Sequence, residues 1–166
     1  MQHLPSIDEL NALELERFLD ALNLLFEGRT PLMRRLFERR PFTTYEGLIV
    51  AAGEVMGTLR MDEIAQVIDA HPRIGASRQE LLRGSGLSYA EQGDAEARVA
   101  AELRKLNQSY ERRFGFRFVV FVNRRPQAAL LPVLRARLAH SVEDERRTAL
   151  ADILAIARDR LEKLSE

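Results

Sequence analysis

Apolar residues recur every three or four positions along most of this chain, and this helical spacing narrows the possible folds more than any other feature does. The first stripe runs from Leu10 to Phe26, after the capping-box pair Ser6 and Glu9, and Gly28 ends it. We therefore expect an all-α bundle of about seven helices in a single domain. The expected helices cover residues 6–28, 30–41, 43–59, 62–70, 88–114, 126–139 and 141–164.

Two stretches break this period. Residues 72–87 hold one proline and three glycines, which predicts a loop. Residues 116–122 follow Gly115, a predicted helix cap, and form a short apolar run in which Arg117 is the one polar member. The run is too short for a membrane span and too apolar for a surface loop, so it is a buried strand, a buried extended segment or a buried helix end. We expect a single-domain bundle packed on one short buried extended segment at 116–122.

Composition limits the classes of function. With 166 residues, of which 46% are apolar and 30% charged, the chain fits one soluble globular domain over residues 1–166. Its 25 basic and 25 acidic residues leave no basic excess, which argues against binding to nucleic acid or to an anionic membrane. The lack of cysteine excludes disulfides and a cysteine nucleophile. We find no signal-peptide pattern and no window near the ~18 apolar residues of a membrane span, so we expect a cytoplasmic protein.

His71 is the histidine best placed for chemistry. It comes at the end of a predicted helix and precedes Pro72 and a glycine-containing loop, where free backbone groups can meet a ligand. An imidazole with an unperturbed pKa of ~6.5 exchanges protons near neutral pH. The alternative is an ordinary histidine at a helix C-terminus, stabilised by the helix dipole.

A second group of polar residues, Ser88, Glu91 and Gln92, begins the next long helix. Ser88 and Glu91 have the spacing of a capping box, which is a structural role. A helix N-terminus also presents free N–H groups and a positive dipole end to an anionic ligand. In that case Ser88 and Gln92 donate hydrogen bonds, and Glu91 is a proton partner for His71.

Arg160 lies at the edge of the apolar stripe of the last helix, where its side chain either extends to water or meets a buried anion. The residues for metal or nucleotide chemistry are lacking. The three histidines are scattered and no pair has metal-ligand spacing, so we expect no metal site. Glycine motifs that bind phosphates or dinucleotides are also absent, which leaves a cofactor-free acid–base enzyme as the catalytic interpretation.

Five short motifs follow one another along the chain: His71-Pro72, Ser88-x-x-Glu91-Gln92, Asn107-x-x-Tyr110, Phe114-Gly115-Phe116-x-Phe118 and Arg160-Leu161. In this order and spacing they resemble the 2-oxo-4-hydroxy-4-carboxy-5-ureidoimidazoline (OHCU) decarboxylase family. The resemblance covers nearly the whole chain. The chain departs from the family pattern at Arg117, where proline is usual, and this departure concerns the local backbone rather than the chemistry.

The resemblance implies the third step of urate breakdown. The enzyme removes the carboxylate of OHCU as carbon dioxide and delivers (S)-allantoin. The family fold is all-helical, uses neither a metal nor an organic cofactor, and commonly forms homodimers. The C-terminus does not carry the peroxisomal address of many eukaryotic members, which favours a cytoplasmic enzyme of the bacterial type.

The resemblance also implies roles for individual residues. His71 is the general acid–base, and Glu91 orients it or relays its proton. The substrate supplies its own electron sink, a C=N bond beside the carbon that loses carbon dioxide. An extended segment among helices offers backbone groups to the substrate ring, because no helix consumes them. The expected substrate-binding residues are Pro72, Ser88, Tyr89, Ala90, Gln92, Phe118, Val119, Val120, Phe121, Val122 and Arg160.

Two other classes of function stay open at the level of the sequence. A non-catalytic all-helical interaction module predicts that the polar residues named above are dispersed and that an apolar groove is exposed elsewhere. An RNA-binding protein with a basic patch predicts affinity that depends strongly on salt. Convergence of His71, Ser88, Glu91, Gln92 and Arg160 on one cavity favours the enzyme.

Overall fold

The computed structural model describes residues 3–74 and 89–165, with side chains in the second range described from residue 96 onward. This part of the chain contains helices and no strands, so the predicted all-α class is confirmed. The helices are α1 (Ile7–Ala12), α2 (Leu15–Leu22), α3 (Pro31–Glu38), α4 (Tyr45–Met56), α5 (Met61–Asp69), α7 (Tyr89–Phe114), α8 (Gln127–Arg137) and α9 (Val142–Ser165).

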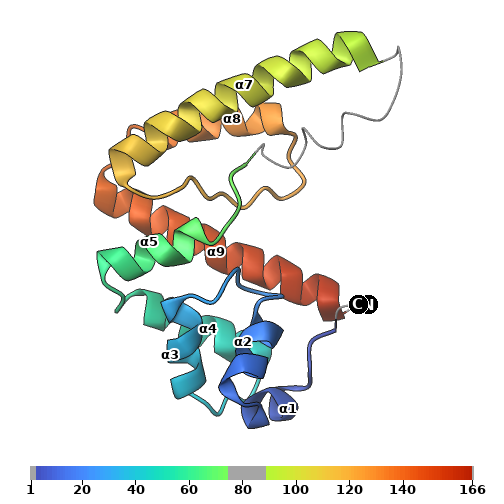
Figure 1. The fold of residues 1–166 in the computed structure, drawn as a ribbon, viewed down its shortest axis with the longest axis vertical. Coiled ribbons are helices and arrows are strands. Elements are labelled where there is room, and N and C mark those ends of the chain that lie inside the picture. The colour runs from blue at the N-terminus through green and yellow to red at the C-terminus, as the bar shows by residue number, and fades with distance from the viewer. Residues whose placement is uncertain (1–2, 75–88, 166) are drawn as a thin grey trace.

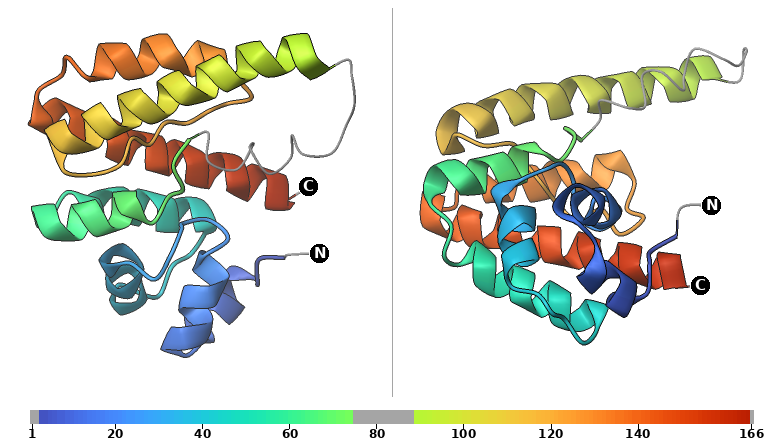
Figure 2. Two further views of the ribbon diagram at one scale, coloured as in Figure 1. Left: turned by 45° about the horizontal axis from the view of Figure 1, so that its top comes forward. Right: turned by 60° about the horizontal axis from the view of Figure 1, so that its bottom comes forward.

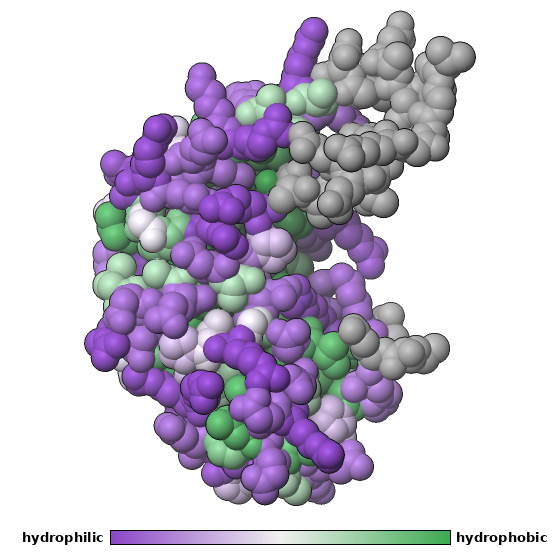
Figure 3. Space-filling view, in the orientation of Figure 1, coloured by the Kyte–Doolittle hydropathy of each residue, from purple (hydrophilic) through white to green (hydrophobic). Residues whose placement is uncertain are grey.

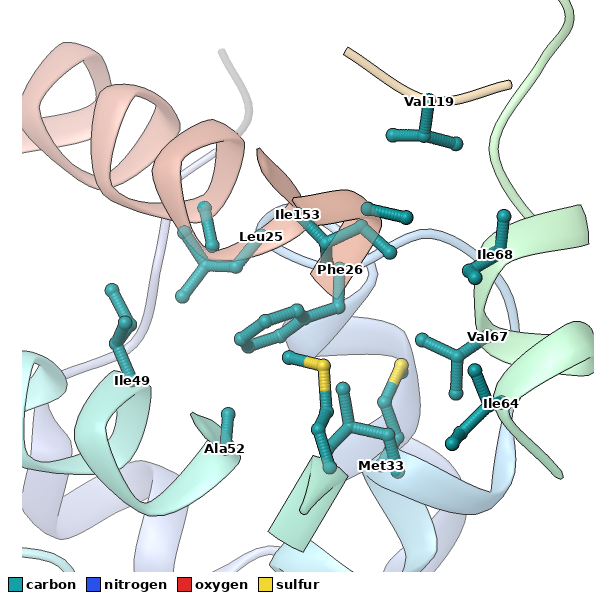
Figure 4. Close-up of a cluster of buried hydrophobic side chains, with 14 of the residues drawn as sticks. Leu25, Phe26, Met33, Ile49, Ala52, Ile64, Val67, Ile68, Val119 and Ile153 are labelled. Atoms are coloured by element: carbon teal, nitrogen blue, oxygen red, sulfur yellow. The ribbon is translucent and has the colours of Figure 1, made fainter. Parts of the chain in front are cut away.

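The last helix, α9, crosses the middle of the molecule (Figure 1). α7 and α8 pack side by side on one side of it, and α1 to α5 lie on the other (Figures 1 and 2). Side chains from these elements meet in an apolar cluster that includes Phe26, Met33 of α3, Ile64 of α5 and Ile153 of α9 (Figure 4). Because burial of each such side chain contributes about 1.5–3 kcal/mol, this cluster fixes how α5 and α9 are placed.

The prediction of one helix over residues 6–28 is wrong, because the chain breaks between α1 and α2. The backbone at Leu13 is extended, with φ −68° and ψ 145°. Arg40 donates hydrogen bonds to the carbonyls of Asn11 (2.7 Å) and Leu13 (2.8 Å), which satisfies the end of α1 from a distant residue. The side chain of Asn11 in turn pairs with the backbone of Phe42. The spacing of apolar residues depends on neighbours three or four positions apart, so it cannot predict a helix break that depends on partners 27 to 31 positions away.

Residues 117–122 form neither a helix nor a strand and run as an irregular chain between α7 and α8 (Figure 1), which leaves the buried extended segment of the three conformations that the sequence left open. α7 ends as predicted at Gly115, whose φ is 78° and whose N–H donates to the carbonyl of Glu111 at 2.9 Å. Burial covers less of the segment than expected. Phe118, Val119 and Val120 are buried, whereas Val122 is 37% exposed, because the chain there turns outward toward α8.

A group of buried polar side chains, here called the buried cluster, anchors this segment. Arg137 of α8 donates to the carbonyl of Val119 at 2.7 Å, to Glu145 at 2.6 Å and to Asp152 at 3.0 Å. The hydroxyl of Tyr110 donates to the same carboxylate of Glu145, which is fully buried. Within this cluster one buried nitrogen, Nη2 of Arg137, makes no hydrogen bond, although it lies 2.5 Å from the carboxylate of Glu145. The other groups bond to one another, and the segment is held to α7, α8 and α9 through the carbonyl of Val119.

The surface is mostly polar. Charged and polar residues cover most of the face shown in Figure 3, and apolar residues form separated patches on it. Among the described residues, the large apolar side chains that are exposed are Val50, Met61, Val122 and Val142. Isolated apolar residues of this kind are normal on monomeric proteins. None of the described helices is long and apolar enough to cross a bilayer.

Candidate active site

A cleft with a volume of about 490 Å³ lies where α5 ends, beside the extended segment and α9. Its walls include His71 and Pro72 after α5, residues 118–122, and Arg160 of α9. The structure thus brings together predicted site residues that are up to 89 positions apart, counted from residue 71 to residue 160. The roles assigned to these residues stay predictions.

The remaining predicted site residues cannot be placed in this cleft. Ser88 lies outside the described residues, and so does the predicted loop from residue 75 onward. Tyr89, Ala90, Glu91 and Gln92 belong to the first turn of α7, but their side chains lie outside the described part. The proposed contact between His71 and Glu91 is therefore untested.

The end of α5 buries the imidazole of His71. The backbone N–H of His71 donates to the carbonyl of Ile68 at 3.1 Å, which closes the last turn, and Pro72 prevents the helix from continuing. The residue is only 5% exposed. Burial lowers the pKa of His71 to about 4, with Glu27 acting against this shift and Arg160 adding to it. At neutral pH the imidazole is therefore uncharged, with one ring nitrogen that can accept a proton and one N–H that can donate a hydrogen bond.

Arg160 meets a carboxylate that the sequence analysis missed. Its guanidinium lies 2.5 Å from Glu27 and also contacts the carbonyl of Leu25 at 3.4 Å. Both side chains of the ion pair are about one-third exposed or less, at 31% for Arg160 and 26% for Glu27. Arg160 therefore pairs with a carboxylate of the protein itself, and this pair is partly exposed rather than buried. A guanidinium has five N–H donors, so this arrangement leaves donors for a bound anion.

The loop after α2 places Glu27 at this position. The N–H of Gly28 donates to the side chain of Asn23 at 2.8 Å, which folds the loop back on itself. Gly28 has a φ of 71°, and a Cβ atom there would lie 3.0 Å from the Cβ of Ala70, the residue before His71. Glycine thus allows the loop to approach the end of α5. No local signal in the sequence marks Glu27, because α2 ends at Leu22 and the partner Arg160 lies 133 positions away along the chain.

The wall formed by residues 118–122 is less open to a ligand than expected. Arg125 donates to the carbonyls of Phe121 (2.7 Å) and Val122 (3.1 Å), and Arg137 takes that of Val119. The expectation that the backbone of this wall is wholly unconsumed is therefore wrong for these three carbonyls. The chain turns at Asn123 and Arg124, which have φ of 46° and 59°, and this turn brings Arg125 back over the wall.

Basic side chains surround the cleft. Arg73, Arg124, Arg125 and Lys163 line it together with Arg160, and Asp159 is the acidic residue among the lining groups. Arg73, Arg160 and Lys163 each pair with a carboxylate, so among the described residues the positive excess comes from Arg124 and Arg125. A positive excess of this kind favours anionic ligands. In the described residues we find no group of three or more histidine, aspartate or glutamate side chains that could hold a metal ion.

Comparisons with known proteins agree on one family. The family model described as OHCU decarboxylase matches residues 11–162. Proteins named 2-oxo-4-hydroxy-4-carboxy-5-ureidoimidazoline decarboxylase are 31% identical in Haloferax volcanii (96% of this chain, 95% of the relative) and 28% identical in Halalkalicoccus jeotgali (96% and 92%). A human protein named as a putative member is 30% identical over 95% of this chain and 94% of its own length.

Solved structures share the fold. A crystal structure of (S)-allantoin synthase superposes with a TM-score of 0.68 at 19% identity, over 96% of this chain and 54% of that chain. A crystal structure of OHCU decarboxylase in the presence of (S)-allantoin superposes with a TM-score of 0.65 at 20% identity, over 89% of this chain and 99% of that chain. The arrangement of helices is therefore common to these proteins.

Proposed function

Because this chain belongs to the OHCU decarboxylase family, we propose that it removes the carboxylate of 2-oxo-4-hydroxy-4-carboxy-5-ureidoimidazoline and yields (S)-allantoin during urate degradation. One observation of the structure carries the proposal for this chain. A buried, neutral imidazole at His71 and the guanidinium of Arg160 border the same basic cleft. A proton acceptor and an anion-binding group on one cavity suit a substrate that must lose a carboxylate and move a proton.

The proposed chemistry needs no electron acceptor other than the substrate. When the C–C bond to the carboxylate breaks, carbon dioxide leaves and the electron pair forms a C=C bond in the ring, while the pair of the adjacent C=N bond moves to the ring nitrogen, which takes a proton from water. His71 then takes the hydroxyl proton of this enol as that carbon becomes a carbonyl, and the C=C pair becomes available for a new C–H bond. A proton then reaches the neighbouring carbon that bears the ureido group, and its delivery to one face makes the product chiral. Positioned acid–base catalysis of this kind contributes ~10²–10⁴-fold to a rate.

Binding is assigned to the remaining walls of the cleft. Arg160 holds the carboxylate or ureido group with donors that Glu27 does not use, and the basic rim favours entry of the anion. The side chains and free backbone groups of residues 118–122 enclose the ring. Glu91 orients His71 or relays its proton, and Ser88 and Gln92 donate to the ureido group.

The setting of the enzyme is part of the same proposal. We place it in the cytoplasm, as a single domain over residues 1–166 that works without metal or organic cofactor and forms a homodimer. The relatives with this name in Haloferax volcanii and Halalkalicoccus jeotgali match this chain over most of their own length, which supports the single domain.

The proposal is tested by making OHCU in situ from urate with the two preceding activities, oxidation and ring hydrolysis. Purified protein is added, and circular dichroism follows the decay of OHCU and the appearance of optically active allantoin. We expect faster decay and a product that is the S enantiomer. Racemic allantoin forming at the spontaneous rate contradicts the proposal.

A further inference from the structure

Arg117 connects the two walls of the cleft. It is the first residue of the extended stretch, and its backbone N–H donates to the carboxylate of Asp69 at 2.9 Å. Its guanidinium donates through one nitrogen to the carbonyl of Asp69 at 2.8 Å and to the carbonyl of His71 at 3.3 Å. One residue thus bonds both to the last residue of α5 and to the residue that carries the imidazole.

The physical chemistry of a helix end explains why these bonds form. The last carbonyls of a helix have no partner within it and carry a partial negative charge. A guanidinium satisfies such carbonyls with charge-assisted hydrogen bonds, which are stronger than neutral ones. The carboxylate of Asp69 also accepts a bond from the backbone N–H of Arg117, so Arg117 joins the two segments by three hydrogen bonds across 46 to 48 positions of sequence.

Other contacts near His71 act on the chain that follows it. Arg73 forms an ion pair with Glu111 at 2.7 Å, and the amide of Asn107 donates to the carbonyl of Ile74 at 3.3 Å. These contacts attach residues 73–74 to α7. Among the described contacts, the bond from Arg117 is the one that joins the main chain of His71 to the wall.

We propose that Arg117 is a positioning residue for the decarboxylation: it holds the main chain of His71 in register with residues 118–122, so that imidazole and wall face the same bound substrate. The inference rests on the proposed function, and it revises the expectation that the departure at Arg117 concerns the local backbone alone, because that backbone is bonded to His71. Arg117 does not itself border the cleft, so it acts through His71 rather than on the substrate. A displacement of ~1 Å between catalytic groups can cost ~100-fold in rate, which makes such a link consequential.

The test compares Arg117→Ala and Arg117→Lys with Arg39→Ala. Arg39 also joins two segments, through an exposed ion pair at 2.7 Å to Glu54, but it lies away from the cleft. We expect Arg117→Ala to lower kcat about 10- to 100-fold with KM little changed, and to lower the enantiomeric excess of allantoin. Arg117→Lys should recover part of kcat, because an ammonium group can also donate to these carbonyls. Arg39→Ala should change neither kcat nor enantiomeric excess.

A second readout separates this inference from the proposed function. The imidazole of His71 is titrated by NMR in the wild type and in Arg117→Ala, without any substrate. If Arg117 positions His71, its loss admits water, and the pKa of His71 rises from about 4 toward its ordinary value. An unchanged titration, an unchanged kcat, or a loss of kcat that Arg39→Ala reproduces overturns the inference. A wild type that is inactive toward OHCU overturns the proposed function, while the NMR result still decides whether Arg117 positions the imidazole.

Discussion

Two arginines near the extended segment have the same chemistry and opposite surroundings. Arg137 in the buried cluster is 4% exposed and donates to Glu145, Asp152 and the carbonyl of Val119. Arg160 at the cleft has Glu27 as its carboxylate partner and one long contact to a carbonyl. The difference between them is access: the side chain of Arg137 is 5% exposed and lies among carboxylates of the fold, whereas that of Arg160 is 31% exposed and borders the cleft, where its unused donors can meet a ligand.

This comparison extends to the two polar regions as wholes. The buried cluster ties the segment to three helices through buried charges that pair with one another, so its removal should act on stability. The cleft holds a neutral imidazole and a half-satisfied guanidinium in a partly open cavity, so changes there should act on catalysis and binding. The four predictions that follow test this division, beginning with the largest expected effect.

His71→Gln should lower kcat toward OHCU by ~10²–10⁴-fold, because it removes the proton acceptor while keeping a polar side chain of similar size. The protein should stay folded at pH 7. Steady-state kinetics and circular dichroism measure the two quantities. The matched control is His140→Gln, since His140 contacts Glu145 of the buried cluster at 3.0 Å and should leave kcat unchanged. Undiminished turnover in His71→Gln would refute the assignment.

Arg137→Met should lower the free energy of unfolding by about 3–5 kcal/mol, because it leaves the carboxylate of Glu145 buried without its cation. Urea denaturation at pH 7 measures the change. Arg137→Met combined with Glu145→Met should be less destabilised than the single variant, since two apolar side chains remove the stranded charge. If Arg137→Met lowers the free energy of unfolding by less than about 1 kcal/mol, Arg137 contributes no more than a surface ion pair and the prediction is wrong.

The stability of the protein should fall in mild acid because of His71. Its pKa is about 4 in the folded state against 6.5 for the free side chain, so the unfolded chain binds the proton more tightly. The contribution is complete above pH ~6.5 and is lost as the pH falls to about 4, by roughly 3 kcal/mol in total. Urea denaturation between pH 7 and pH 4 should show a flatter pH dependence in His71→Gln than in the wild type. Parallel curves contradict the burial of a neutral imidazole.

Arg160→Gln should raise KM for OHCU roughly 10- to 100-fold, because charge-assisted hydrogen bonds of about 1.5–3 kcal/mol are lost. The free energy of unfolding should change by less than about 1 kcal/mol, since its ion pair with Glu27 is partly exposed. Arg137→Met is the matched comparison, because in that variant the free energy of unfolding should change and KM should not. A KM equal to that of the wild type removes Arg160 from substrate binding.

Much of the fold was readable from local patterns. Stripes of apolar residues located the helices after residue 30 to within a few positions, and Gly115 ended α7 where its sequence position indicated. The patterns work because helical spacing and caps depend on residues three or four apart. The split between α1 and α2 was not readable, since it depends on Arg40 reaching the carbonyls of Asn11 and Leu13.

The candidate site divides in the same way. The sequence by itself determined that His71 ends a helix before a proline, that the apolar run 116–122 interrupts the helical spacing, and that the family motifs occur in order. Only the tertiary structure decided that Arg160 pairs with Glu27, that Arg137 belongs to the interior, and that Arg117 bonds to His71. The physical reason is that every arginine has the same guanidinium, whatever its position in the sequence. Its role depends on its partners, which lie up to 133 residues away along the chain.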